Sequence, residues 1–255
     1  MIQVLGKAKD NSPPKLHVLV LASAPTRHGL YFVGNLSSPL LIPFKGRPAL
    51  STFLEQFSGH NLYFAVSEKA DSVIKLVTKK DNCELIKVPK EIVNQEPLRC
   101  FEFCLEKIGY PDNVLTLHGD NIYIKKNLPE ILLESQKIAA LTYIHEYSNV
   151  NYSYLTKPVF NSREWREIKE LGNTVNTGGF YFPTTRSLKT LSKKGERYRA
   201  LGLPDLIQEI TDCCTPIELQ EWIDLGHWDL IERHSGNLET RVFNDIKLSK
   251  NREYL

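Results

Sequence analysis

Three charged side chains, Arg27, Asp120 and Asp224, each come shortly after or at the end of an apolar segment of strand length. Two carboxylates with free oxygens can hold Mg²⁺ and let the ion bridge phosphate groups. An arginine can bind phosphate oxygens through a bidentate pair of hydrogen bonds. The chemistry that these residue types suggest is therefore the handling of phosphate groups.

Each of these residues also has a plain structural interpretation. Asp120 could belong to a turn after a strand, Asp224 to a strand-ending turn, and Arg27 to the surface. Ligands of open α/β sheets bind beyond the carboxyl ends of the strands. Because all three residues lie at such ends, their order along the chain favours the functional interpretation over the structural one.

The elements that must position these residues begin with residues 16–22, an uninterrupted apolar run. Such a run is typical of a strand buried on both faces of a parallel sheet. Strand-like and helix-like segments then alternate, with strands predicted at 61–66, 83–88, 114–117 and 139–146, and helices at 49–57, 68–78, 97–108 and 128–137. This alternation predicts an α/β fold, with a three-layer, mostly parallel sheet and helices on both faces.

The second half of the chain changes character. Strand-like segments at 152–156, 178–182 and 217–225 are separated by helix-like segments at 163–171, 187–191 and 205–211. We expect these strands to be antiparallel additions to the doubly wound first half.

The sequence predicts one domain after a short lead-in. Residues 1–15 form the lead-in, and residues 16–255 a single α/β domain. Within it we expect a nucleotide half at about 16–125 and a substrate half at about 126–255.

Composition excludes several classes of protein. Among 255 residues, 32 Lys and Arg balance 30 Asp and Glu, so no strong charge attracts nucleic acid. The five cysteines show no CxxC spacing, which favours a reducing compartment over a disulfide framework. No apolar run approaches the roughly 18 residues that a membrane span needs, and no signal-peptide core is apparent. We therefore expect a cytoplasmic protein that is not inserted in a membrane.

Six short motifs occur in a fixed order along the chain. They lie at 21–27, 39–50, 119–120, 156–158, 176–181 and 222–226. This order resembles that of the sugar-nucleotide pyrophosphorylases, nucleotidyltransferases of the GT-A-like, Rossmann-related fold. The likeness covers about residues 16–246, and residues 226–244 resemble a subgroup associated with bacterial capsule and surface-polysaccharide loci.

The resemblance implies a reaction with two phosphorylated partners. A nucleoside triphosphate would meet a sugar 1-phosphate, or another small phosphorylated acceptor, with Mg²⁺ as cofactor. The nucleoside monophosphate would be transferred and pyrophosphate released, for bacterial surface-polysaccharide biosynthesis. Enzymes of this kind often self-associate, which leaves a homo-oligomer open, although the sequence carries no interface signature.

Four site residues take roles in the chemistry under this resemblance. Asp120 and Asp224 would hold Mg²⁺, Arg27 would face the leaving β- and γ-phosphates, and Lys157 would meet the acceptor phosphate.

Further residues would bind the two substrates under the same resemblance. The nucleotide would be bound by Ala22, Ser23, Ala24, Lys45 and Gly119. The acceptor would be bound by Asn176, Gly178 and Gly179, where glycine lets the backbone approach the sugar.

The chain departs from the family pattern at its phosphate loop. The family reads Leu-Ala-x-Gly-x-Gly-Thr-Arg, whereas residues 21–27 are one residue shorter, lack glycine, and contain Pro25. Thr156 stands where the family has glutamate, and Ser38 where it has lysine.

The sequence leaves three alternatives to a transferase of this family. A pseudo-transferase that only binds nucleotide or nucleotide sugar fits the altered loop.

The other two alternatives lack their expected motifs. A glycosyltransferase of the same broad fold commonly carries Asp-x-Asp, which this sequence does not contain. A hydrolase using His118 or His227 would need a Gly-x-Ser-x-Gly elbow, which is also missing.

Overall fold

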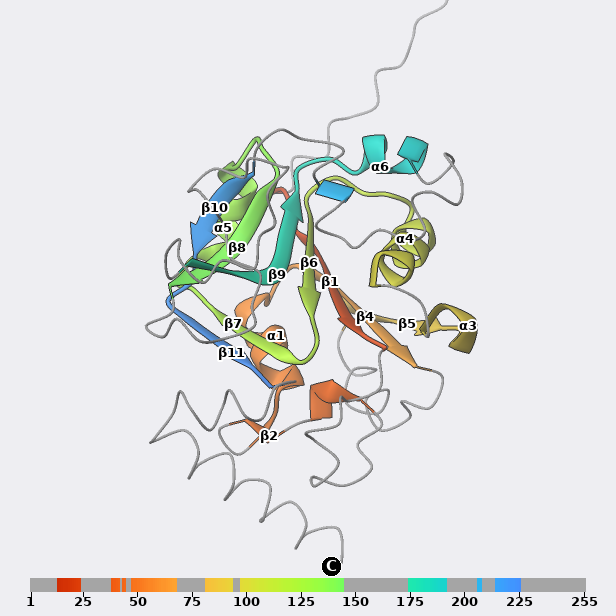
Figure 1. Ribbon diagram of the computed structural model, residues 1–255, viewed down its shortest axis with the longest axis horizontal. Coiled ribbons are helices and arrows are strands. Elements are labelled where there is room, and N and C mark those ends of the chain that lie inside the picture. The colour runs from red at the N-terminus through yellow and green to blue at the C-terminus, as the bar shows by residue number, and fades with distance from the viewer. Residues whose placement is uncertain are drawn as a thin grey trace, which may run out of the picture.

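The computed structural model describes residues 13–23, 38–41, 43–44, 47–67, 81–93, 97–144, 174–191, 206–207 and 214–225. Within these residues the chain forms a seven-stranded mixed sheet in the order β10-β8-β9-β6-β1-β4-β5 (Figure 1). Helices cover both faces of this sheet, so the predicted three-layer α/β architecture is confirmed.

Four neighbouring strands at the centre and one edge are mutually parallel. They are β6 (Val114–His118), β1 (His17–Ala22), β4 (Asn61–Ser67) and β5 (Cys83–Val88). Because they are parallel, their carboxyl ends meet at one edge of the sheet, as the alternation of strands and helices predicted.

The other three strands of the main sheet mix the two directions. β9 (Thr174–Phe182) lies antiparallel between β6 and β8 (Ala139–Ile144). β10 (Thr215–Glu218) runs parallel to β8 at the edge. The expected antiparallel additions are therefore confirmed for β9, but the expectation is wrong for β10.

Two small sheets complete the strands. β7 (Asn121–Ile124) pairs antiparallel with β11 (Glu221–Asp224), and the two run side by side in Figure 1. β2 (Pro43–Phe44) pairs antiparallel with β3 (Arg47–Pro48), just after the 3-10 turn Pro39–Leu41. The β7–β11 pair is the one that builds the candidate site.

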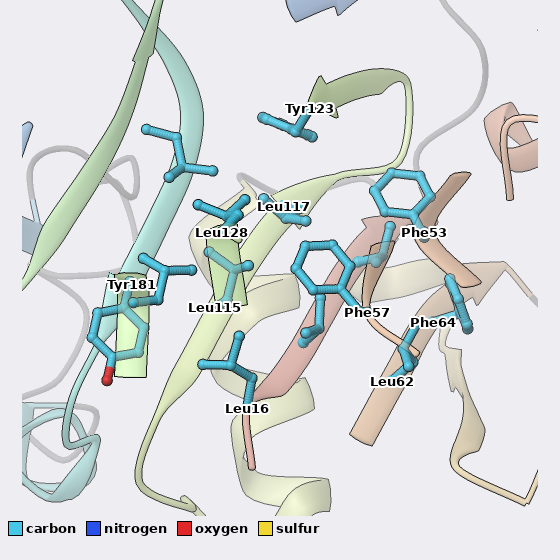
Figure 2. Close-up of a cluster of buried hydrophobic side chains, with 14 of the residues drawn as sticks. Leu16, Phe53, Phe57, Leu62, Phe64, Leu115, Leu117, Tyr123, Leu128 and Tyr181 are labelled. Atoms are coloured by element: carbon cyan, nitrogen blue, oxygen red, sulfur yellow. The ribbon is translucent and has the colours of Figure 1, made fainter. Parts of the chain in front are cut away.

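One face of the sheet is covered by α1 (Leu50–Gln56) and α5 (Leu128–Glu134). Phe53 and Phe57 from the α1 region pack with Leu115 and Leu117 of β6 in the cluster that Figure 2 shows. Each fully buried side chain of this size contributes about 1.5–3 kcal/mol relative to an exposed one.

The opposite face is covered by α4 (Pro97–Ile108) and α6 (Arg186–Leu191), with α3 (Lys90–Val93) nearby. The ring centroid of Phe101 in α4 lies 5.5 Å from that of Phe182 in β9. Side chains of β1 alternate between the two faces, since Val18 and Val20 join the first core and Leu19 the second. Burial on both faces explains why the sequence of β1 is apolar without interruption.

The segment 217–225 is not the single strand that its apolar sequence predicts. It contains the end of β10 and all of β11, with a change of sheet between them. The backbone N–H of Leu219 donates to the carbonyl of Thr142 in β8 at 2.7 Å. The next N–H, that of Gln220, donates to Ile124 in β7 at 2.9 Å. The chain therefore passes from one sheet to the other within two residues.

Other predicted bounds differ less. The helix expected at 128–137 ends at Glu134, where Ser135 takes an extended conformation and its hydroxyl donates to the carbonyl of Lys137 at 3.0 Å. β7 was not expected as a strand. The segments predicted at 68–78, 152–156 and 163–171 lie outside the described residues.

Among the described residues, no helix is long and apolar enough to cross a membrane. The described cysteines form no disulfide, and Cys100 and Cys104 are small core residues, as predicted.

Candidate active site

The carboxyl ends of β1 and β6 are held together by a glycine. The N–H of Gly119 donates to the carbonyl of Leu21 at 2.8 Å. A Cβ at Gly119 would lie only 2.5 Å from the Cβ of Ala22, which is far inside normal contact. The lack of a side chain at Gly119 thus lets the turn after β6 close against β1, and the next residue, Asp120, is fixed there.

Asp224 reaches the same place through the β7–β11 pair. Asp224 is the register partner of Asn121, the residue after Asp120. The N–H of Leu225 donates to the backbone carbonyl of Asp120 at 2.7 Å. Both carboxylates are half-buried. The backbones of the two residues predicted as metal ligands therefore lie side by side, although Asp224 belongs to a small separate sheet rather than to a strand of the main one.

Two buried side chains orient the carboxylate of Asp120. The indole Nε1 of Trp222 donates to Oδ1 of Asn121 at 2.8 Å. The Nδ2 of Asn121 in turn donates to Oδ1 of Asp120 at 2.8 Å. This chain fixes the rotamer of Asp120 and leaves its second oxygen, Oδ2, without a hydrogen bond to any described residue. Asn121 was not predicted as a functional residue, and its only signal in the sequence is its place directly after the Gly-Asp pair.

Tyr123 joins the strands beneath the two carboxylates, at one end of the labelled cluster in Figure 2. Its hydroxyl accepts from the N–H of His118 at 3.1 Å and donates to the carbonyl of Thr177 at 3.2 Å. Burial raises the pKa of Tyr123 well above its usual value, the bond from His118 opposes this rise, and the charges of Asp120 and Asp224 add to it. The hydroxyl of Tyr123 therefore stays neutral and links β6 to β9, and the charges of both carboxylates are close enough to affect its pKa.

The glycines of β9 lie beside the carboxyl end of β6. Gly178 has a positive φ of 76°, and a Cβ there would lie 2.6 Å from Cδ2 of His118. The N–H of Gly178 donates to Oδ1 of Asn176 at 3.0 Å. A Cβ at Gly179 would lie 2.8 Å from Cδ1 of Leu141. Both glycines therefore have packing reasons of their own, and their predicted role in acceptor binding stays a prediction.

Ser23 continues directly from β1 and is buried. Its Oγ lies 3.3 Å from Sγ of Cys100 in α4, so the hydroxyl is directed onto the helix that covers this face. A hydrogen bond from the thiol of Cys104 lowers the pKa of Cys100, burial opposes the effect, and the bond with Ser23 supports it. Ser23, within the predicted phosphate loop, is thus anchored on α4.

The structure brings together most of the predicted site residues that it describes. Gly119 and Asp120 follow β6, and Ala22 and Ser23 lie at the end of β1. Asn176, Gly178 and Gly179, which are predicted to bind the acceptor, are all on β9, and Asp224 ends β11. The predicted residues Arg27, Lys157, Ala24 and Lys45 lie outside the described residues. Their roles stay predictions.

The carboxylate pair fits the donor chemistry of Mg²⁺. In the part of the chain that the structure describes, no group of three or more His, Cys, Asp or Glu forms an all-protein metal site. Mg²⁺ does not require one, because it keeps several waters and is usually held by one or two carboxylates together with substrate phosphates. Asp120 and Asp224 supply such a pair, and Oδ2 of Asp120 is available for it.

No model of a protein family matches the chain, and no curated protein matches it in sequence. Solved structures do match. The inositol-1-phosphate CTP transferase from T. maritima is 15% identical with a TM-score of 0.63, over 88% of this chain and 98% of that one. A putative glucose-1-phosphate thymidylyltransferase from Bacillus anthracis is 14% identical with a TM-score of 0.65, over 86% and 93%.

A UDP-glucose pyrophosphorylase complexed with UDP-glucose is 12% identical, with a TM-score of 0.62, over 94% of this chain and 100% of that one. These matched structures are sugar-nucleotide transferases. The chain has the nucleotidyltransferase fold of these proteins over most of its length, as the order of its motifs predicted.

Proposed function

We propose that the protein transfers a nucleoside monophosphate from a nucleoside triphosphate to a sugar 1-phosphate or similar small phosphorylated acceptor, with release of pyrophosphate. One observation carries this proposal. Beyond the carboxyl end of β6, the backbone segments that carry Asp120 and Asp224 are paired, with a hydrogen bond from the N–H of Leu225 to the carbonyl of Asp120. The matched solved structures, which are named for reactions of this class, support the same choice.

The chain's own residues contribute mainly positioning, which carries much of the rate in phosphoryl-type transfer. Asp120 is held in one rotamer by Asn121, and Asp224 is held by the β7–β11 pairing. Together they would hold Mg²⁺, which when bound would neutralise charge on the triphosphate. Tyr123 keeps the strands beneath them in register without adding a charge.

Three further roles follow from the motifs. In the proposal Arg27 faces the leaving pyrophosphate, and Lys45 and the segment 22–24 contact the triphosphate. Lys157 binds the acceptor phosphate. The product would feed bacterial surface-polysaccharide biosynthesis in the cytoplasm, as the resemblance of residues 226–244 and the cysteine usage suggest.

A second candidate function is nucleotide or nucleotide-sugar binding without catalysis. It is favoured by the segment 21–27, which lacks the glycines of the family and contains Pro25. Glycines in such a loop expose backbone N–H groups to phosphates, and proline has no N–H to offer.

Pyrophosphate release tests the proposal directly. The full chain is incubated with each of the four common ribonucleoside triphosphates or dTTP, together with a panel of sugar 1-phosphates and inositol 1-phosphate. We expect release with one base and one acceptor, dependent on both substrates and abolished by EDTA. Thermal stabilisation by a nucleotide without any pyrophosphate release would instead support the binding-only function. Neither release nor stabilisation would contradict both.

A further inference from the structure

His118 occupies the centre of the candidate site without a role in it so far. It is the last residue of β6, two positions before Asp120, and it pairs in register with Leu21 of β1. On its other side it faces Gly178 of β9. Its imidazole therefore lies against the strand of the predicted acceptor-side residues, two residues before Asp120, at the edge where ligands of open α/β sheets bind.

The imidazole is held rigidly against the backbone of β9. The position that a Cβ of residue 178 would take lies 2.6 Å from Cδ2 and 2.9 Å from Nε2 of His118, so the ring fills that space. Gly178 also has a positive φ of 76°, a conformation that favours glycine. The backbone N–H of His118 is fixed by the hydroxyl of Tyr123. The ring is consequently positioned before any ligand arrives.

The polar atoms of this ring are still available. His118 is half-buried, and within the described part of the chain neither ring nitrogen makes a hydrogen bond. The other two described histidines differ, because Nδ1 of His17 lies 3.1 Å from the hydroxyl of Tyr63 and Nδ1 of His60 accepts from the N–H of Leu16. An imidazole that packs against β9, with unused ring nitrogens beside a proposed phosphate site, is suited to form hydrogen bonds with a bound ligand.

We propose that His118 is a specificity-determining residue whose imidazole contacts hydroxyl groups on the body of the acceptor. This inference rests on the proposed function. A neutral imidazole offers one donor and one acceptor. Hydroxyl groups can pair with both, whereas a bare phosphate or an apolar group would use one or neither. His118 therefore selects the acceptor, while the carboxylates serve the nucleotide.

Steady-state kinetics of His118→Ala and His118→Asn test the proposal, with His17→Asn as the matched control. We expect the KM for the acceptor to rise about tenfold or more in His118→Ala, with the KM for the nucleotide within about twofold of wild type. His118→Asn, which keeps a short polar side chain, should recover part of the loss. His17→Asn should leave both KM values unchanged. An unchanged acceptor KM, or an equal rise in both KM values, overturns the assignment.

A binding measurement separates this inference from the proposed function. The Cε1–H proton resonance of His118 is assigned by its loss in His118→Asn. Sugar 1-phosphates, inositol 1-phosphate and nucleotide sugars are then added without turnover. A shift of this resonance with a hydroxylated ligand, and none with inorganic phosphate, supports the inference even if the chain releases no pyrophosphate. No shift with any of these probes, or the same shift with inorganic phosphate, contradicts it.

A double-mutant cycle checks that the ring of His118 lies against Gly178. Gly178→Ala should lower the melting temperature, because the new Cβ meets the His118 ring and the backbone has a positive φ. In the His118→Ala background the loss should be smaller, since only the backbone strain remains. Equal losses in both backgrounds would show that the ring does not lie against Gly178, and would overturn the proposed geometry.

Discussion

The two ends of the parallel strands both carry polar side chains, but these differ in whether the protein itself satisfies their hydrogen bonds. At the amino end, the rings of His17 and Tyr63 stack with centroids 5.8 Å apart and also share a hydrogen bond. His60 accepts a backbone N–H there. At the carboxyl end, the ring of His118 and Oδ2 of Asp120 have no such partners among the described residues.

The difference shows how a fold separates structure from chemistry. Burial lowers the pKa of His17 and of His60, so both stay neutral and serve packing. At the other end the buried groups Tyr123 and Asn121 are satisfied by neighbours, and Asn121 orients the half-buried carboxylate of Asp120. Polar atoms that the protein itself does not use are those that a ligand can use.

The largest expected effect is that of removing one carboxylate charge at the carboxyl end. Asp120→Asn should reduce turnover by about 100-fold or more, since a bound metal supplies several kcal/mol of charge stabilisation. Asp112→Asn is the control: this exposed residue precedes β6 at the amino end, 3.6 Å from the guanidinium of Arg186. Pyrophosphate release measures both variants. Similar activity in the two would remove Asp120 from the metal site.

A smaller effect should follow from loss of the indole that supports Asn121. Trp222→Phe keeps the aromatic packing but removes the Nε1 donor to Oδ1 of Asn121. Groups that orient a metal ligand change metal affinity by about 10–100-fold when mutated. We therefore expect a higher Mg²⁺ concentration for half-maximal activity, with a nearly unchanged maximal rate. A Mg²⁺ titration identical to wild type would show that the chain from Trp222 to Asp120 has no functional role.

The smallest effect concerns stability at the amino end. Folding lowers the pKa of His17 from its usual 6.5, mainly through burial, against the raising effect of Asp112. Just below pH 6.5 the unfolded chain binds this proton more readily than the folded chain. The free energy of unfolding is therefore unaffected by this group well above pH 6.5, and it decreases as the pH falls below that value. The melting temperature should decline less steeply from pH 7 to 5.5 in His17→Asn. Parallel declines would contradict this.

Sequence patterns predicted the framework of the fold because the apolar period was strong there. The bounds of β5 and α4 were predicted to the residue, and the buried run of β1 to within one. The break between β10 and β11 was not predicted, because an apolar run does not reveal that its two halves bond to different sheets. β7 was missed because a four-residue strand after Gly-Asp is too short to show a period.

The candidate site was predicted in part by the same reasoning. The rule of strand ends selected Asp120 and Asp224, which the structure brings together. It could not select Asn121 or assign His118 to the site, since their partners Trp222 and Gly178 are distant in sequence. Such contacts depend on register between strands, which a single sequence does not encode in any local pattern.

The pairing of β7 with β11 also sets the order of events during synthesis. Asn121 and Trp222 are 101 residues apart. A ribosome that adds about 5–20 residues per second needs about 5–20 seconds to bridge that interval. Throughout this time the residues of β1, β4, β5 and β6 have already been synthesised, whereas those of β11, which pair with β7, have not. The four parallel strands are therefore complete in the nascent chain before Asp224 can be placed beside the segment that carries Asp120.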